Sequence, residues 1–332
     1  MMFKKKSLRI NSYLGYGTNT RLRAIGRALK DENIDFSGNT GTLKTLHNIY
    51  KQFESDEIPN EEITLHLPEG KSFTTKTDTE GYYFFDKKTT IESHLIDDKG
   101  WVHYTISYKN IFKKNITNSN AFSGKMLVPS QEASYGIISD IDDTILHTGV
   151  ASLFKWRVIA NTFFKNFDRR LPLEGTVKFY KKLQSGKNKH ASNPVFYVSN
   201  SPWNLYDYLN AFLCKHGFPE GPILLRDFRT PFDKTPKPKS PHKQSEILNL
   251  LQLYPKLKFV LIGDSGEKDA DIYTKIAKDH PNRILAIYLR SVNHKRKEKR
   301  IQKIISSFKS TPILLVRTTI EAEEHARKFD IL

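Results

Sequence analysis

The sequence predicts a chain of two parts, an antiparallel β-sandwich followed by an α/β domain built on a parallel sheet. In the first part, several short stretches alternate apolar and polar residues, which is the pattern of half-buried strands. In the second part, short apolar runs alternate with helical patterns, as they do in parallel sheets with right-handed crossovers. A length of 332 residues fits about two domains. We place the first domain at residues 1–130 and the second at residues 131–332.

The strands of the first domain are clearest in residues 63–67 and 102–108, where apolar and polar side chains alternate strictly. Turn signals containing glycine separate such stretches at residues 68–70, 78–81 and 98–100. Residues 21–31 fit either a strand or a helix, because Gly26 weakens both patterns. Residues 130–134 carry no periodic pattern and mark the boundary between the two domains.

The second domain contains six short apolar runs that we expect to form buried parallel strands. They are residues 135–138, 194–198, 223–225, 257–262, 284–289 and 313–316. Helical patterns follow or separate them at residues 175–183, 203–215, 243–254, 295–303 and 322–328. Residues 228–242 are rich in proline, lysine and threonine, and a loop of this length in a compact domain is usually functional or mobile.

Residues 153–167 have aromatic and apolar side chains at the spacing of one helix face, with basic residues between them. One interpretation is a cap helix that packs its aromatic side chains on the core. The other is a face that contacts a membrane, because Trp156, Phe163 and Phe164 lie among Lys155 and Arg157.

Composition sets outer limits on the function. The chain is 38% hydrophobic, which is sufficient for folded cores, and its single cysteine, Cys214, excludes an intramolecular disulfide and fits a reducing compartment. No apolar stretch is long enough for a signal peptide or a spanning helix. From the sequence we expect a soluble, cytoplasmic protein, with peripheral membrane association left open.

Positive charge is concentrated in the second domain. Residues 131–332 contain 34 basic and 21 acidic side chains, a net charge of +13, against 19 and 15 in residues 1–130, a net charge of +4. An excess of this kind favours an anionic substrate or surface. Nucleic acid is a weaker alternative, because aromatic residues in the basic stretches follow helix spacing and do not form a stacking platform.

An acidic run at residues 139–144 directly follows the first apolar run of the second domain. Asp140 and Asp142 are two residues apart, so an extended chain directs both side chains to the same side. Open α/β sheets bind ligands at the carboxyl ends of their strands, and Mg²⁺ takes one or two carboxylates together with phosphate oxygens. The alternative is an acidic turn without chemistry.

Four further polar residues follow other strands or open helices of the same domain. Ser199 follows the second strand, Lys243 opens a helix, and Asp264 and Asp269 follow the fourth strand. Each has a plain structural alternative: a helix cap, a solvated lysine or a turn. Together with Asp140 and Asp142, these four residues would provide all the groups that phosphoryl transfer needs. Asp140 would be the nucleophile and Asp142 the general acid and base, and the others would supply a hydroxyl donor, a fixed positive charge and a cation site.

This ordered set resembles the four motifs of the haloacid dehalogenase superfamily, in the branch with a second aspartate that contains its phosphatases. More narrowly, residues 138–144, 197–206 and 263–269 are similar to the catalytic domain of the actin-patch-type phosphatidate phosphatases, which are distant relatives of the lipins. The resemblance extends over residues 135–289. It implies a haloacid-dehalogenase-like Rossmannoid sheet and a Mg²⁺-dependent phosphatase that converts phosphatidate, or a similar phosphomonoester lipid, to diacylglycerol and phosphate through an aspartyl-phosphate.

The same resemblance implies a site for this reaction. Its catalytic residues would be Asp140, Asp142, Thr144, Ser199 and Lys243; its substrate-binding residues Asn200 and Arg226; and its Mg²⁺ ligands Asp140, Asp142 through its backbone carbonyl, Asp264 and Asp269. The expected partner is a phosphomonoester substrate at an anionic membrane surface, with no nucleic acid, and the sequence indicates no protein partner. Two alternatives stay open: a phosphatase for a soluble phosphomonoester, and a binding module that senses phosphate or lipid.

Overall fold

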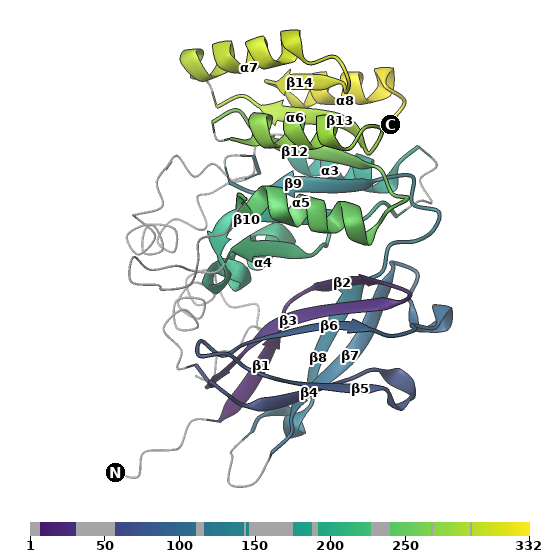
Figure 1. Cartoon of the computed structure of the whole chain (residues 1–332), viewed down its shortest axis with the longest axis vertical. Helices are drawn as coiled ribbons and strands as arrows, with labels where there is room; N and C mark the ends of the chain where they lie inside the picture. Colours follow the sequence, from purple (N-terminus) through teal and green to yellow (C-terminus); the bar gives the residue numbers. More distant parts are fainter. Residues whose placement is uncertain are drawn as a thin grey trace. The chain divides into compact units, whose positions relative to one another are not determined.

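The computed structural model describes residues 7–30, 57–110, 116–142, 144–145, 175–187, 192–226, 240–266, 268–292 and 294–332 (Figure 1). These residues form two compact units, one that ends at Val128 and one that starts at Pro129. The predicted helix at residues 153–167 and most of the predicted loop, residues 228–239, lie outside the described residues.

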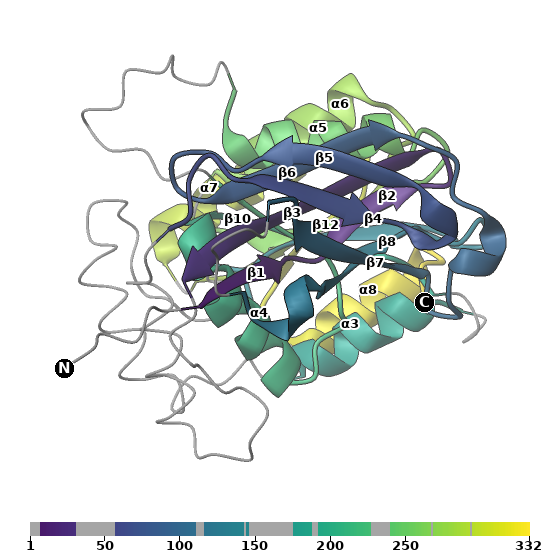
Figure 2. The same ribbon diagram turned by 90° about the horizontal axis from the view of Figure 1, so that it is seen from below.

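The first unit contains eight strands in one hydrogen-bonded order, β1-β3-β2-β8-β7-β4-β5, with β6 paired to β3. All pairs are antiparallel except β2 with β8. Figure 2 shows β3, β6 and β5 side by side, so β6 lies between β3, near one end of the strand order, and β5 at the other end, around one apolar core. This confirms the predicted β-sandwich. The strands are β1 (Leu8–Ser12), β2 (Gly15–Thr18), β3 (Arg21–Lys30), β4 (Glu62–His66), β5 (Ser72–Lys76), β6 (Tyr82–Lys88), β7 (Trp101–Tyr108) and β8 (Phe122–Leu127).

Alternation explains the strands that the sequence predicts. In β7 the side chains of Val102, Tyr104 and Ile106 are buried in the core, whereas His103 is exposed. Of the ambiguous residues 21–31, the structure describes 21–30, and they form strand β3. Gly26 belongs there because β3 is paired on both sides: an added Cβ would lie 2.1 Å from the carbonyl oxygen of Asn11 on β1.

The second unit is a six-stranded, wholly parallel sheet with the order β11-β10-β9-β12-β13-β14. The chain builds the sheet outward from β9 to β11, then returns and builds from β12 to β14, so the switch of direction falls between β9 and β12. Open α/β sheets bind ligands at the carboxyl ends of strands at such a point. The strands are β9 (Gly136–Asp140), β10 (Val195–Pro202), β11 (Ile223–Arg226), β12 (Phe259–Asp264), β13 (Ile284–Arg290) and β14 (Ile313–Val316).

Helices cover both faces of this sheet. Helices α5 and α6 pack together on one face, and α3 and α8 pack together on the other (Figures 1 and 2). The helices are α3 (Thr176–Ser185), α4 (Tyr206–Lys215) after a short 3-10 turn, α5 (His242–Leu253), α6 (Asp269–Asp279), α7 (Lys295–Ser307) and α8 (Thr319–Lys328). The sequence analysis misses only α6 among them. Its buried residues Ile272, Tyr273 and Ile276 have helical spacing, but they follow the Gly-Asp motif, where a loop is the natural expectation.

Among the helices that the structure describes, none combines the length and the apolar character needed to cross a lipid bilayer.

Candidate active site

The carboxylate of Asp140 is the centre of the candidate site. Asp140 ends β9, the strand beside the switch point, and its side chain is fully buried. Its Oδ1 forms an ion pair with the Nζ of Lys243 at 2.9 Å, and its Oδ2 accepts a hydrogen bond from Thr144 Oγ1 at 3.1 Å. Both carboxylate oxygens are therefore fixed in orientation.

Lys243 lies in the first turn of α5 and is 1% exposed, which is rare for a lysine. Its ammonium group contacts two carboxylates, Asp140 and, at 2.7 Å, Oδ1 of Asp269. The neighbouring His242 adds no charge at neutral pH, because burial lowers the pKa of this imidazole to about 4. Lys243 is thus a fixed positive charge between Asp140, at the end of β9, and Asp269, at the start of α6.

Asp269 can reach this position because residue 263, the first residue of the Gly-Asp motif, is a glycine. It is the first residue of α6, and its Oδ2 accepts a hydrogen bond from the backbone nitrogen of Asp264 at 3.3 Å. An added Cβ on Gly263 would lie only 2.3 Å from the same Oδ2. A side chain at residue 263 would therefore push the Asp269 carboxylate away from Lys243.

Asp140, Asp264 and Asp269 form a buried acidic triad. One carboxylate oxygen of each lies within 4.8 Å of the others. Hard oxygen donors at this density are the ligands that Mg²⁺ and Ca²⁺ take in proteins. Three carboxylates and one ammonium leave two negative charges in a buried cluster, which one divalent cation would neutralise. The donor set therefore fits a divalent cation.

The pKa of Asp140 also favours a bound cation at this site. Burial raises the pKa of Asp140 well above its ordinary value; Lys243 opposes this effect, and the nearby carboxylates of Asp269, Asp142 and Asp264 add to it. A nucleophilic carboxylate must be ionised. A cation among these acids would favour the ionised form, as Lys243 does.

Asp142 has a different environment from the triad. Its Oδ2 accepts hydrogen bonds from Ser199 Oγ at 2.6 Å and from Ser201 Oγ at 3.3 Å, both at the end of β10. The Oγ of Ser199 in turn accepts from the backbone nitrogen of Ser201 at 2.9 Å. The predicted acid–base residue and the predicted hydroxyl donor therefore contact each other, and Ser201 is a further member that the sequence analysis does not single out.

Asn200 and Arg226 lie at the same edge of the sheet. Asn200 is near the end of β10, next to β9, whereas Arg226 ends β11, one strand farther away. Burial lowers the pKa of the Arg226 guanidinium, and in the described part of the chain its buried Nε makes no hydrogen bond. Their predicted role in substrate binding stays a prediction.

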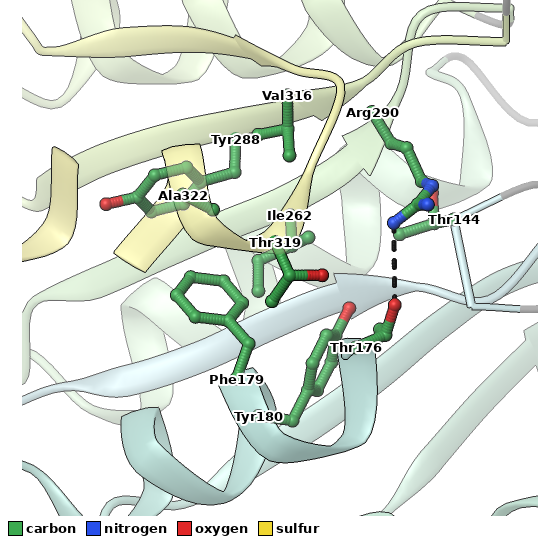
Figure 3. Close-up of a pocket in the computed structure, with 10 residues that line it drawn as sticks. All are labelled: Thr144, Thr176, Phe179, Tyr180, Ile262, Tyr288, Arg290, Val316, Thr319 and Ala322. Carbon is green, nitrogen blue, oxygen red and sulfur yellow. Dashed lines mark hydrogen bonds between the residues drawn. The ribbon is translucent and has the colours of Figure 1, made fainter. Parts of the chain in front are cut away.

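A small cavity of about 30 Å³ adjoins the site on the α3 and α8 face of the sheet. Figure 3 shows Arg290 and Thr144 at one end of it, with Phe179, Tyr288 and Ala322 toward the other. Arg290 Nη1 donates to Thr176 Oγ1 at 3.4 Å, the bond drawn in the figure. The volume suits a water molecule or two. Sequence reasoning misses Arg290, and the available signal was its place directly after a predicted strand.

Comparison with known proteins places this unit among described families. Residues 135–291 match the family described as "Phosphatidate phosphatase APP1, catalytic domain". The chain is 41% identical over 160 residues to phosphatidate phosphatase APP1 of Saccharomyces cerevisiae, a match that covers 47% of this chain and 25% of the yeast protein. It is 30% identical over 275 residues to the uncharacterized protein C29B5.04c of Schizosaccharomyces pombe, covering 82% of this chain and 40% of that protein. The chain thus matches less than half the length of either relative.

Proposed function

Residues 135–291 of the chain belong to the family of phosphatidate phosphatase APP1 catalytic domains, and on that basis we propose that the protein is a Mg²⁺-dependent phosphatase acting on phosphatidate or a similar phosphomonoester lipid. The observation that carries the proposal is the buried carboxylate of Asp140. It lies at a strand end beside the switch point of the sheet, in contact with Lys243 and in a triad with Asp264 and Asp269.

Asp140 is the nucleophile in this proposal. Its carboxylate attacks phosphorus, a bond forms between an aspartate oxygen and phosphorus, and the ester bond to the leaving alkoxide breaks. The second step releases phosphate when water attacks the aspartyl-phosphate and restores the carboxylate. The contacts with Lys243 and Thr144 support this role, because they hold the carboxylate in one orientation before the substrate arrives.

Asp142 moves the protons. As a carboxylic acid it protonates the leaving alkoxide, and as a carboxylate it then takes a proton from the attacking water. Its hydrogen bonds from Ser199 and Ser201 fix its rotamer two residues from the nucleophile. In this proposal the hydroxyl of Ser199 turns from Asp142 to a phosphoryl oxygen when substrate binds, which is the role that its motif implies, and Ser201 keeps its bond to Asp142.

The cation would be held by Asp140, Asp264, Asp269 and the backbone carbonyl of Asp142. When bound, Mg²⁺ supplies positive charge that stabilises the phosphoryl oxygens in the transition state. Lys243 contributes a second positive charge that does not depend on the metal, since it is held by two ion pairs within the fold.

The substrate class rests on the family and on charge. A phosphomonoester lipid is anionic, and residues 131–332 carry a net charge of +13. Arg226, with a buried Nε that makes no hydrogen bond in the described part of the chain, and Asn200 are the candidate contacts to the phosphate group. We place the enzyme at the surface of a membrane in a reducing compartment, where the lipid substrate is accessible.

Release of inorganic phosphate tests the function. The purified chain with Mg²⁺ is compared with its Asp140→Asn variant on phosphatidate in detergent micelles and on a soluble aryl phosphomonoester. We expect turnover of phosphatidate by the wild type and essentially none by the variant, with equal thermal unfolding midpoints. If Asp140→Asn released phosphate as fast as the wild type, Asp140 could not be the nucleophile. If the wild type hydrolysed the soluble ester but not phosphatidate, the soluble-substrate alternative would be favoured.

A further inference from the structure

A surface at the carboxyl edge of the parallel sheet combines basic side chains with one exposed isoleucine. It comprises Lys295, Arg296 and Lys299 from the start of α7, with Arg317 and Ile320 from the β14–α8 turn and the first turn of α8. We call this set the α7–α8 edge surface. All five side chains are exposed.

The first turn of α7 and the β14–α8 turn contact each other near this surface through one ion pair. Helices α7 and α8 both pack against the edge strand β14, and Arg317 Nη2 contacts Glu298 Oε2 at 3.4 Å. The glutamate belongs to the first turn of α7, between Arg296 and Lys299 in sequence. Arg317 and Ile320 are three residues apart at the start of α8. The start of α7, with its basic side chains, and the start of α8, with Ile320, are therefore neighbours at this edge of the sheet.

This surface adjoins the candidate active site. Helix α7 follows β13 and α8 follows β14, so both helices begin at the carboxyl edge of the sheet, where Asp140 and Asp264 also lie. The ammonium group of Lys297 is 3.3 Å from the position that a Cβ on Gly266 would occupy, within the Gly-Asp motif. A flat partner on the α7–α8 edge surface would thus lie on the same side of the sheet as the Gly-Asp motif of the candidate site.

The charge of α7 is not balanced by its own acids. Residues 295–303 contain six basic side chains and one acidic side chain. Ile301 is buried and fixes the inward face, which leaves Lys295, Arg296, Lys299 and Lys303 on the outward face. Among the ion pairs of the described residues, Arg300 contacts Asp271 and Arg317 contacts Glu298, and none involves Lys295, Arg296 or Lys299.

Ile320 adds an exposed apolar side chain to this basic surface. It is 70% exposed, the most exposed large apolar side chain among the described residues. Neighbouring Thr318 and Glu321 form a capping box that fixes the start of α8, so Ile320 is held outward by a rigid turn. Basic residues around an exposed aliphatic side chain are the composition of surfaces that bind anionic bilayers, where charge attracts and the apolar side chain inserts.

We infer that the α7–α8 edge surface docks the second unit on an anionic phospholipid bilayer and thereby presents the carboxyl edge of the sheet to lipid headgroups. The inference rests on the proposed function for its choice of a lipid partner. Nucleic acid would use the basic side chains alone. A bilayer also uses Ile320, and this difference decides the experiment.

The test measures binding of the full chain to phosphatidylcholine vesicles with and without phosphatidylserine, an anionic lipid that is not a phosphomonoester. The triple variant Lys295→Gln, Arg296→Gln, Lys299→Gln is compared with a control triple, Lys256→Gln, Lys258→Gln, Lys278→Gln. The control residues are exposed lysines at the amino edge of the same sheet. With about fivefold for each charge near the surface, the edge triple should weaken binding to anionic vesicles on the order of a hundredfold, and the control triple much less.

Ile320 separates a bilayer from other polyanions. Ile320→Ser should weaken vesicle binding by about tenfold, Ile320→Leu should restore it, and neither should change binding to heparin. Equal losses for the two triples, or loss of vesicle and heparin binding together with no effect of Ile320→Ser, would overturn the inference. Turnover of a soluble aryl phosphomonoester should be unchanged in every variant. Absence of turnover in the wild type would count against the proposed function alone, because vesicle binding is read without catalysis.

Discussion

Substitution of Gly263 by alanine should lower activity about a hundredfold by displacing the Asp269 carboxylate by about 1 Å. The added Cβ would lie 2.3 Å from Asp269 Oδ2 and 2.8 Å from Tyr273 Cε2. Cβ atoms do not approach oxygen so closely, so the Asp269 carboxylate must move by about 1 Å. It would then leave Lys243, which it contacts at 2.7 Å, and the backbone nitrogen of Asp264.

Two effects set the magnitude. Overpacking of a core costs about 1–3 kcal/mol of unfolding free energy. A misplacement of about 1 Å in a catalytic array costs on the order of a hundredfold in rate. We therefore expect Gly263→Ala to unfold at lower denaturant concentration and to lose about a hundredfold in kcat for a phosphomonoester. Urea unfolding and steady-state phosphate release measure the two quantities.

Gly136→Ala is the matched control. It creates the same kind of clash, since its Cβ would lie 2.5 Å from Phe259 Cε1, but at the amino end of β9, away from Asp269 and Lys243. It should cost similar stability and leave kcat within a few-fold of wild type. If Gly263→Ala lost stability but kept wild-type kcat, the Asp269–Lys243 ion pair would have no part in catalysis.

Three further results are expected. Asp142→Asn should lose less activity on aryl phosphates than on alkyl phosphates, because a good leaving group needs little protonation; equal losses in kcat would make Asp142 structural. Mg²⁺ should support turnover and Ca²⁺ should inhibit it, because calcium accepts more ligands and can draw the second oxygen of Asp140 into coordination; activity after exhaustive chelation would exclude a metal requirement. Thr144→Val should lower kcat by about tenfold to a hundredfold, because it leaves Oδ2 of buried Asp140 without this donor. Thr176→Val, which lines the same cavity, should have little effect, and equal effects of the two variants would place the cause in the cavity.

Much of the second unit could be predicted because local pattern and global topology agree there. Apolar runs of strand length became β9 to β14, and the rule that parallel strands end at one edge predicts that Asp140, Lys243 and Asp264 lie together. The structure shows these three close to one another. Their chemical roles are still predictions, since proximity alone does not establish catalysis.

Other features could not be predicted because long-range packing decides them. No local pattern indicates that Ser201 would donate to Asp142, or that Arg290 would line a cavity with Thr144. The strand order is also set by how helices pack on both faces. In the first unit, Gly26 left strand and helix equally plausible until pairing with β1 and β6 required a residue without a side chain.

The two faces of the parallel sheet carry different parts of the site, and the alternation of β9 explains why. Ser139 and Asp140 are adjacent, so their side chains leave opposite faces. Ser139 Oγ lies 2.6 Å from the hydroxyl of Tyr180 on α3, whereas Asp140 contacts Lys243 on α5. A slip of one residue in β9 would place the hydroxyl against the buried lysine and the carboxylate against a tyrosine whose pKa burial already raises. The ion pair of Asp140 with Lys243 and the contact of Ser139 with Tyr180 both require the observed register, so the pairing of β9 with β10 and β12 also orients the nucleophile.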